Sequence, residues 1–384
     1  MLIILSVIVL SVGVKACWVS CATSGHGSLD GEKKEIIRRT NYLTSKVSTN
    51  PQKLLDEMPS GIGTQFQGEW ALYTCSMTCA ALANIAILYP QNKETAIKFI
   101  GQIIDIAMSE EIRGYDKLRW SEDPMEGIYG NLSHISYYSH LAWMISRYKQ
   151  IGGDDKYDGL YHSLCKAMNR RICQSPILNA PTYPGEYIYI PDMLVAIVAL
   201  SNYAHQYGGK YQSIVDRWIE KASSEWIDSE TGLLASFLEE DNGKAQIVLP
   251  VKGSYSALNC YYLSLVDSEF AKEQYECLKK YFRQSFPVNG ISEYHDKSCW
   301  LGMDIDAGPI IFNLSPSGTA FAIGCATSLG DMEFRNQLLK TAEIAGSTVR
   351  WFDKSHYLLA NLALVGEAIT LAMRTSAPQT IIKK

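Results

Sequence analysis

The feature that most constrains the fold is a helical pattern that recurs along the chain. Apolar-patterned segments of helical length come in pairs, with hardly any strand-like alternation between them. The second helix of a pair often follows a short turn rich in Gly, Asp or Asn, as at residues 151–158 and 328–337. The first five pairs start about sixty residues apart. Their first, more apolar helices, and that of the last pair, are expected to begin near Glu69, Asn131, Pro191, Gly253, Ser315 and His356.

This repeat predicts a closed ring of helical hairpins. Five complete hairpins leave a last helix, residues 357–374, without a partner, and residues 30–47 have the charged amphipathic pattern that can supply one. Six hairpins that close on themselves form an all-α (α/α)6 barrel, a toroid with apolar helices inside and polar helices outside. An open solenoid is the alternative, but it would not leave an unpaired helix at each end of the chain.

The N-terminus differs from the rest of the chain. Residues 2–14 are an almost unbroken apolar run, which is too short to span a bilayer comfortably and is closer to a secretory signal. We therefore expect residues 1–24 to be a signal peptide or a membrane or lipid anchor, and residues 25–384 to be a single α/α-barrel domain. The protein is then exported, to the periplasm, the extracellular space or a membrane surface. Cys17 is a candidate for lipidation, but Val14-Lys15 before it fits that signal poorly.

Composition and motifs exclude several classes of function. A net charge of −5 with no long basic run argues against nucleic-acid binding. No G-x-S-x-G, G-x-G-x-x-G, P-loop or H-E-x-x-H motif is present, so we expect a small-molecule substrate but neither a cofactor nor a metal. The ten cysteines form no zinc-type pairs and fit buried small side chains, with a disulfide as the alternative in an exported protein. A homo-oligomer and anchoring through the N-terminus both stay open.

Chemistry-bearing residues stand where the inner helices begin, and in a closed ring these points gather at one end. Asp192 follows Pro191 directly before a nearly apolar run; it could face a pocket or simply cap its helix. His134 and His140 are six residues apart and cannot share one face of a helix. We favour His140 for the pocket because it lies deeper in the apolar pattern, and a buried structural histidine is the alternative.

The segment "DIDAGPIIF" places two acids before an inner helix, with Gly308-Pro309 expected to turn the chain down into the ring. One of Asp304 and Asp306 could face the pocket while the other holds the loop, or both could bond loop amides. Calcium bound with Glu293 is a third reading, although the spacing does not support it. The remaining candidates for the mouth of the ring are Trp70, Tyr73, Glu126, Tyr189, Tyr255 and His356.

Four stretches together resemble a known family. They are "SHISYYSHLAWM", "YIPDMLVAIVAL", "KGSYSALNCYYLSLVDSEFAKEQY" and "DIDAGPIIFNLSPSGTAFAIGCATSLGD". In this order they resemble the α/α6-barrel family of linalool dehydratase/isomerase, from about residue 65 to residue 370. The resemblance implies the barrel fold and places Asp192, His140 and Tyr73 at the pocket. Tyr189 and Val198 stand where the characterised enzyme has two cysteines, so a thiol mechanism does not carry over.

Carboxylates, histidines and tyrosines in an aromatic, partly dry pocket are suited to acid–base catalysis without a cofactor. The first hypothesis is a lyase or isomerase, of the dehydratase or hydratase type, acting on a small and mainly apolar alcohol or alkene. The catalytic residues would be Asp192, His140, Asp306 and Tyr73. The substrate-binding residues would be Tyr255, Tyr189, Glu126, Trp70, Asp304 and His134.

Two other functions are compatible with the same pattern. Closed α/α toroids often host glycoside hydrolases, lyases or epimerases, so a carbohydrate-active enzyme is the alternative. In that case Trp70, Trp120 and Trp300 could stack on a sugar, and Arg113 and Arg119 could bind a uronate. A non-catalytic ligand-binding barrel is the third reading.

Overall fold

The computed structural model describes residues 29–377 apart from 60, 62 and 362. The expected signal or anchor segment, residues 1–24, and the candidate lipidation site Cys17 lie outside the described residues.

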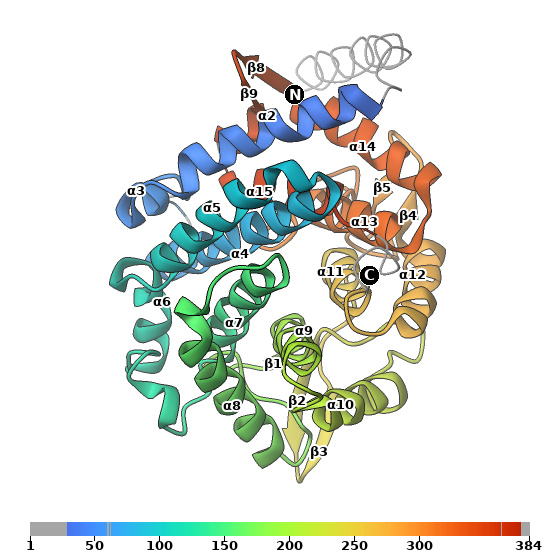
Figure 1. Cartoon of the computed structure of the whole chain (residues 1–384). Helices are drawn as coiled ribbons and strands as arrows, with labels where there is room; N and C mark the ends of the chain where they lie inside the picture. The colour runs from blue at the N-terminus through green and yellow to red at the C-terminus, as the bar shows by residue number, and fades with distance from the viewer. Residues whose placement is uncertain (1–28, 60, 62, 362, 378–384) are drawn as a thin grey trace.

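The inner wall is a ring of helices in which each helix packs on the next and the last packs on the first, so that the ring is closed (Figure 1). This arrangement confirms the predicted (α/α)6 barrel. The inner helices, in chain order, are α4 (Thr64–Leu88), α7 (Ile135–Gln150), α9 (Ile190–Gln206), α11 (Gly253–Leu263), α13 (Pro316–Leu329) and α15 (Leu364–Arg374).

Outer helices cover this ring. The N-terminal helix packs against the first and last inner helices, which confirms that the start of the chain supplies the partner missing from the last hairpin. The first inner helix has two outer partners in succession rather than one. The outer helices are α2 (Leu29–Val47), α5 (Lys93–Ala107), α6 (Glu110–Trp120), α8 (Asp158–Gln174), α10 (Gln212–Glu225), α12 (Ser268–Phe282) and α14 (Met332–Gly346), and a short helix α3 (Pro51–Asp56) follows α2.

The two layers differ in how their side chains are distributed. In α4 all but one of the side chains from Ala71 to Ala86 are buried, because other helices contact it on all sides. This helix is long and apolar enough to cross a membrane by composition, yet most of that stretch is buried inside the ring. Outer helices such as α12 bury one face and expose charged residues on the other.

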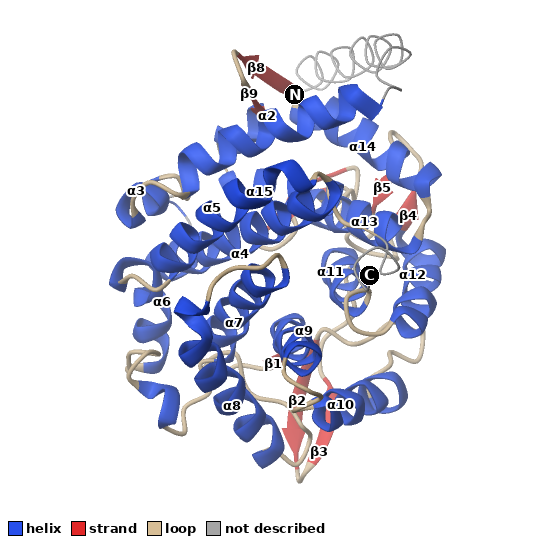
Figure 2. Cartoon of the chain, viewed as in Figure 1, coloured by secondary structure: helices blue, strands red, loops and turns tan. Residues whose placement is uncertain are grey.

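Small antiparallel sheets and single helical turns fill the connections, and the sequence did not predict the sheets (Figure 2). The strands are β1 (Ile188–Tyr189), β2 (Phe237–Asp241), β3 (Lys244–Ile247), β4 (Arg283–Gln284), β5 (Gly290–Ile291), β6 (Leu301–Asp304), β7 (Gly308–Ile311), β8 (Thr348–Trp351) and β9 (Lys354–Tyr357). The 3₁₀ turns are η3 (Pro90–Asn92), η4 (Gly127–Tyr129), η5 (Asp155–Tyr157) and η6 (Leu358–Asn361).

One of these hairpins corrects a predicted turn, and another corrects a predicted helix start. Gly308-Pro309 does not turn the chain directly into an inner helix, because Gly308, with a φ of 84°, opens strand β7. The inner helix α13 begins at Pro316, which confirms the predicted start near Ser315. The last inner helix begins at Leu364 rather than near His356. His356 lies in β9, where its ring stacks on Tyr42 of α2 with 4.0 Å between centroids.

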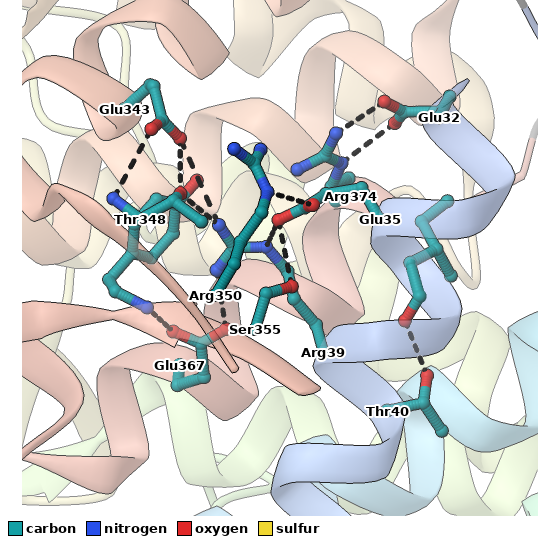
Figure 3. A network of polar contacts seen from close by, with 12 residues as sticks. Glu32, Glu35, Arg39, Thr40, Glu343, Thr348, Arg350, Ser355, Glu367 and Arg374 are labelled. Carbon is teal, nitrogen blue, oxygen red and sulfur yellow. Dashed lines mark hydrogen bonds and ion pairs between the residues drawn. The ribbon is translucent and has the colours of Figure 1, made fainter. Parts of the chain in front are cut away.

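A buried ionic network joins the two ends of the chain (Figure 3). Arg39 of α2 is 1% exposed; its Nη1 donates to Glu367 Oε1 of α15 at 2.6 Å, and its Nε donates to Glu35 at 3.1 Å. Glu367 also accepts from the backbone N–H of Tyr357 at 2.8 Å. Nearby, Arg374 of α15 donates to Glu32 at 2.8 Å. The network therefore ties α2 to α15 where the ring closes.

The described cysteines are all free thiols. Cys75, Cys79 and Cys165 are buried within helices, as the small-hydrophobe reading expects. Cys173 does not fit that reading, because its side chain is exposed on α8.

Candidate active site

Three acids from separate parts of the chain meet at one end of the ring. Glu69 lies on α4, Asp192 in the first turn of α9, and Asp306 in the turn between β6 and β7. Burial, together with repulsion by the charges of Asp192 and Asp306, raises the pKa of Glu69 to about 8, against the opposing effects of Tyr183 and Arg119. Glu69 is therefore mostly protonated at neutral pH.

Asp192 is fully buried and lies against Tyr73 and His140. The Tyr73 hydroxyl donates to Asp192 Oδ1 at 3.0 Å, and His140 Nε2 lies 3.8 Å from the same oxygen, farther than a hydrogen bond. The rings of Tyr73 and His140 are tilted against each other with 4.2 Å between centroids. Among the described residues, Tyr73 is the hydrogen-bond donor to this carboxylate, so Asp192 faces the ring interior rather than capping its own helix.

His140 Nδ1 lies 2.9 Å from the Ser76 hydroxyl oxygen, which also lies 3.1 Å from the Tyr73 carbonyl oxygen. When the Ser76 hydroxyl donates to that carbonyl, its oxygen accepts from Nδ1, and Nε2 of the neutral ring carries the lone pair. In this tautomer His140 presents a hydrogen-bond acceptor beside Asp192.

The two acids of the β6–β7 turn have different partners. Asp304 Oδ1 accepts from the backbone N–H groups of Asp306 and Ala307 at 2.9 and 3.0 Å, and its Oδ2 pairs with Lys252 Nζ at 2.8 Å. Asp306 instead accepts from the Tyr255 hydroxyl at 2.6 Å. Burial raises the pKa of Asp306, with repulsion from Asp304 and Asp192 adding to the shift. Asp304 thus holds the turn, while Asp306 is directed toward the other acids.

Aromatic rings border the three acids. Tyr189 lies 5.5 Å from Tyr255 and 5.1 Å from Phe237, between ring centroids, and Phe237 lies 5.3 Å from Tyr255. Tyr189 is half-buried, and Asp306 reaches solvent although protein atoms surround it on most sides. Asp306 and, in part, Glu69 are therefore accessible to solvent at this end of the ring, whereas Asp192 is fully buried.

Several predicted site residues lie elsewhere. His134 is fully buried at the start of α7, with Nδ1 on Asp116 and Nε2 3.2 Å from Glu122, in a cluster of its own. Glu126 is exposed in the turn before η4, and among the described residues no contact links it to the three acids, so the structure does not bring it to this site. Glu293 is buried beneath α11, where it accepts from the backbone N–H and hydroxyl of Ser254.

The predicted sugar-stacking and uronate-binding residues are also dispersed. Trp70 packs partly buried against the hydrophobic core. Trp120 lies against His134, and Trp300 is 61% exposed beside Phe312. Arg113 pairs with Asp123 at 2.9 Å, away from the acids, because that carboxylate satisfies its guanidinium.

Arg119 is the predicted arginine that does lie near the site, since its charge acts on Glu69. It is already engaged, however, because it pairs with Glu186 at 2.7 Å and lies over the ring of Tyr183, 4.2 Å from its centroid.

Glu69 is the functional candidate that sequence reasoning missed, since it was noted only as a helix start. Its spacing carried a usable signal, because Glu69 and Tyr73 are four residues apart and therefore share a face of α4. Phe237 was also missed, and nothing in its local sequence distinguishes it from a core aromatic.

Among the described residues, no group of three His, Cys, Asp or Glu side chains lies close enough to hold a metal ion. Two surface pockets, of about 270 and 370 Å³, lie between outer elements, beside α10 and α12 and beside α5 and η5 respectively. Neither is lined by the three acids, so the site is defined by its chemistry and not by these pockets.

No protein-family model and no curated protein matches the sequence. Solved structures do match the fold. An unsaturated glucuronyl hydrolase specific for heparin matches with a TM-score of 0.57 at 9% identity, over 91% of this chain and 97% of that chain. A family 105 glycoside hydrolase from C. acetobutylicum ATCC 824 matches with a TM-score of 0.52 at 12% identity, over 78% and 92%.

A polysaccharide lyase also matches, with a TM-score of 0.52 at 12% identity, over 91% of this chain and 98% of that chain. These likenesses show the α/α-barrel fold. The three structures named here are a glucuronyl hydrolase, a glycoside hydrolase and a polysaccharide lyase, so the predicted resemblance to linalool dehydratase/isomerase is supported only at the level of the barrel.

Proposed function

We propose that the protein is a carbohydrate-active enzyme that cleaves a glycosidic bond by acid–base catalysis without a cofactor. The observation that carries this proposal is the meeting of Glu69, Asp192 and Asp306 at one accessible end of the ring, with one of them protonated at neutral pH. Enzymes that cleave glycosidic bonds use such pairs of acids, one as proton donor and one as base. The fold neighbours, which include a glucuronyl hydrolase, support the same reading.

The roles follow from the surroundings of each group. Glu69, with its raised pKa, is the general acid; it donates its proton to the leaving oxygen as the carbon–oxygen bond breaks. Asp192, with His140 beside it, is the general base, which takes a proton from the water that adds to the sugar carbon. Asp306 and Tyr255 bind a sugar hydroxyl, and the rings of Tyr189 and Phe237 pack against the sugar face.

Elimination is the second candidate, and the contact between Tyr73, Asp192 and His140 favours it. The resemblance to linalool dehydratase/isomerase implied that these three residues face the pocket, and they do lie in mutual contact. The same base could remove a carbon-bound proton from an alcohol or from a uronate, with loss of the leaving group. Predicted export through residues 2–14 would bring either enzyme into contact with extracellular polysaccharide.

The test incubates the purified full chain with unsaturated uronyl oligosaccharides, saturated uronate oligosaccharides, neutral oligosaccharides and allylic alcohols. Hydrolysis of an unsaturated uronate abolishes its ultraviolet absorbance, whereas elimination creates that absorbance, and mass spectrometry separates addition from loss of water. We expect oligosaccharide products that disappear in Asp192→Asn and Glu69→Gln.

The matched control is Glu126→Gln, which changes an exposed acid away from the site and should keep full turnover. Products from the alcohols alone would transfer the proposal to the dehydratase reading. Products that persist in both Asp192→Asn and Glu69→Gln would refute the assigned site. A complete absence of product from the unsubstituted protein would refute the proposal that it is an enzyme.

A further inference from the structure

Four buried polar atoms line the ring interior beside Asp192 without a hydrogen-bond partner among the described residues. Their side chains come from α7, α9 and α11, and each residue is at most 1% exposed. Buried polar groups are nearly always paired, so four in one place call for an explanation. The atoms are Asp192 Oδ2, His140 Nε2, Trp143 Nε1 and Tyr262 Oη.

Each of these four residues lies next to another member of the set. His140 Nε2 lies 3.8 Å from the Asp192 carboxylate, and the rings of His140 and Trp143 meet edge-on at 6.5 Å. Trp143 meets Tyr262 edge-on at 5.4 Å, and the charge of Asp192 acts on the Tyr262 phenol. The four residues are therefore neighbours in the ring interior, and each contributes one unpaired polar atom.

The donors and acceptors among the four unpaired atoms match those of a single hydroxyl-bearing molecule. Trp143 Nε1 and the Tyr262 hydroxyl are donors. Asp192 Oδ2 is an acceptor, and so is His140 Nε2 in the tautomer whose Nδ1 donates to Ser76. Two donors and two acceptors match a water molecule, which accepts two hydrogen bonds and donates two. A sugar hydroxyl would match three of the four.

We infer that Asp192, His140, Trp143 and Tyr262 form a hydroxyl-binding position inside the ring, and that water occupies it in the free protein. This inference does not depend on the identity of the substrate. Under the proposed function, it places a water molecule against the general base, where its proton can pass to Asp192 or to His140.

The direct test is a crystal structure of the full chain at a resolution that shows ordered water. We expect one density peak within hydrogen-bonding distance of at least three of the four atoms. Crystals soaked with glucose or with glucuronate separate the two sources of the hydroxyl: the peak stays single if it is water, and it merges with sugar density if the substrate supplies the group. An interior without any peak in all three crystals would overturn the inference.

A second test needs no crystals. Tyr262→Phe removes one hydroxyl and leaves the packing unchanged, so a water-bound hydroxyl predicts a lower melting temperature. A hydroxyl without any partner predicts the opposite, because its removal relieves a buried unpaired group. Tyr261→Phe is the matched control: it is the adjacent buried tyrosine, whose hydroxyl is bonded to Ser376 and whose loss should lower the melting temperature. A higher melting temperature in Tyr262→Phe, with a lower one in Tyr261→Phe, would refute the proposed site.

Discussion

Removal of the Glu367 carboxylate should destabilise the ring where α2 and α15 meet and close it. Glu367 accepts from Arg39 Nη1 at 2.6 Å and from the Tyr357 backbone N–H at 2.8 Å, and it is 2% exposed (Figure 3). Loss of one partner from a buried ion pair typically destabilises a protein by about 3–5 kcal/mol, because the other charge is left uncompensated. In Glu367→Ala, Arg39 keeps Glu35 at 3.1 Å, so we expect the lower end, about 3 kcal/mol.

This loss can be converted into a thermal shift. At about 2.1 cal/mol/K per residue, a chain of 384 residues has an unfolding entropy of about 0.8 kcal/mol/K, so 3 kcal/mol lowers the melting temperature by about 4 °C. Urea denaturation and differential scanning calorimetry measure both quantities. Glu225→Ala, which breaks an exposed pair with Lys221, is the control and should cost under about 0.5 kcal/mol. Equal losses in the two variants would refute the reasoning.

Three further predictions concern single residues. Because the pKa of Glu69 is raised to about 8, the folded protein keeps a proton that the unfolded chain releases above pH 4.5, the ordinary pKa of the group. The stability of the fold should therefore fall as pH rises from 4.5 toward about 8. Glu69→Gln should remove this slope in melting curves recorded from about pH 5 to about pH 9. The pH dependence has the opposite sign for Glu32, because Arg374 lowers the pKa of this carboxyl to about 2 against the effect of burial. The stability that Glu32 contributes is present above pH 4.5 and should be lost as pH falls toward about 2. Glu32→Gln should flatten acid-unfolding curves over that range. Gly68→Ala should destabilise the protein by about 1–3 kcal/mol, because its Cβ would lie 2.6 Å from Tyr115 Cβ, whereas Gly114→Ala meets nothing within 4 Å and should be neutral or stabilising in the same denaturation assay.

The ring was predictable because it depends on patterns that span many residues. Inner helices such as α9 are apolar on nearly every side, outer helices such as α12 on one side only, and the alternation recurs at a regular spacing. The partnership of α2 with α15 followed from counting unpaired helices.

The short hairpins were not predictable for the same reason, since strands of two to five residues leave too few positions to show alternation. The segment before Leu364 illustrates this. "KSHYLLANLAL" is apolar enough to extend a helix, but its first four residues pair with β8 instead. His356 was therefore assigned to the mouth of the ring, although it lies in β9 and its ring stacks on Tyr42 of the outer helix α2.

The candidate site was only partly predictable. Asp192, His140, Tyr73, Asp306 and Tyr255 lie near one another. Asp192 and Tyr255 stand in the first turn of inner helices, where the positional rule puts them, whereas Tyr73 and His140 lie further along their helices and Asp306 lies in the hairpin before α13. Their catalytic roles stay predictions. His134 meets the same positional rule but turns away, because its left-handed backbone, with a φ of 49°, directs it to Asp116 and Glu122. Such a backbone preference is not visible in the residues themselves.

The closure of the ring by α2, α4 and α15 also determines when the N-terminal helices can finish packing during synthesis. The Arg39–Glu367 hydrogen bond joins residues 328 positions apart, and α4 completes its packing only when α15 arrives. A nascent chain emerges with its N-terminal helices first, so α2 and the apolar α4 must wait for almost the whole chain to leave the ribosome. Contacts of such long range slow folding, and the waiting surfaces favour aggregation. Overproduction of this protein should therefore depend more on chaperone supply and growth temperature than on the stability of the finished ring.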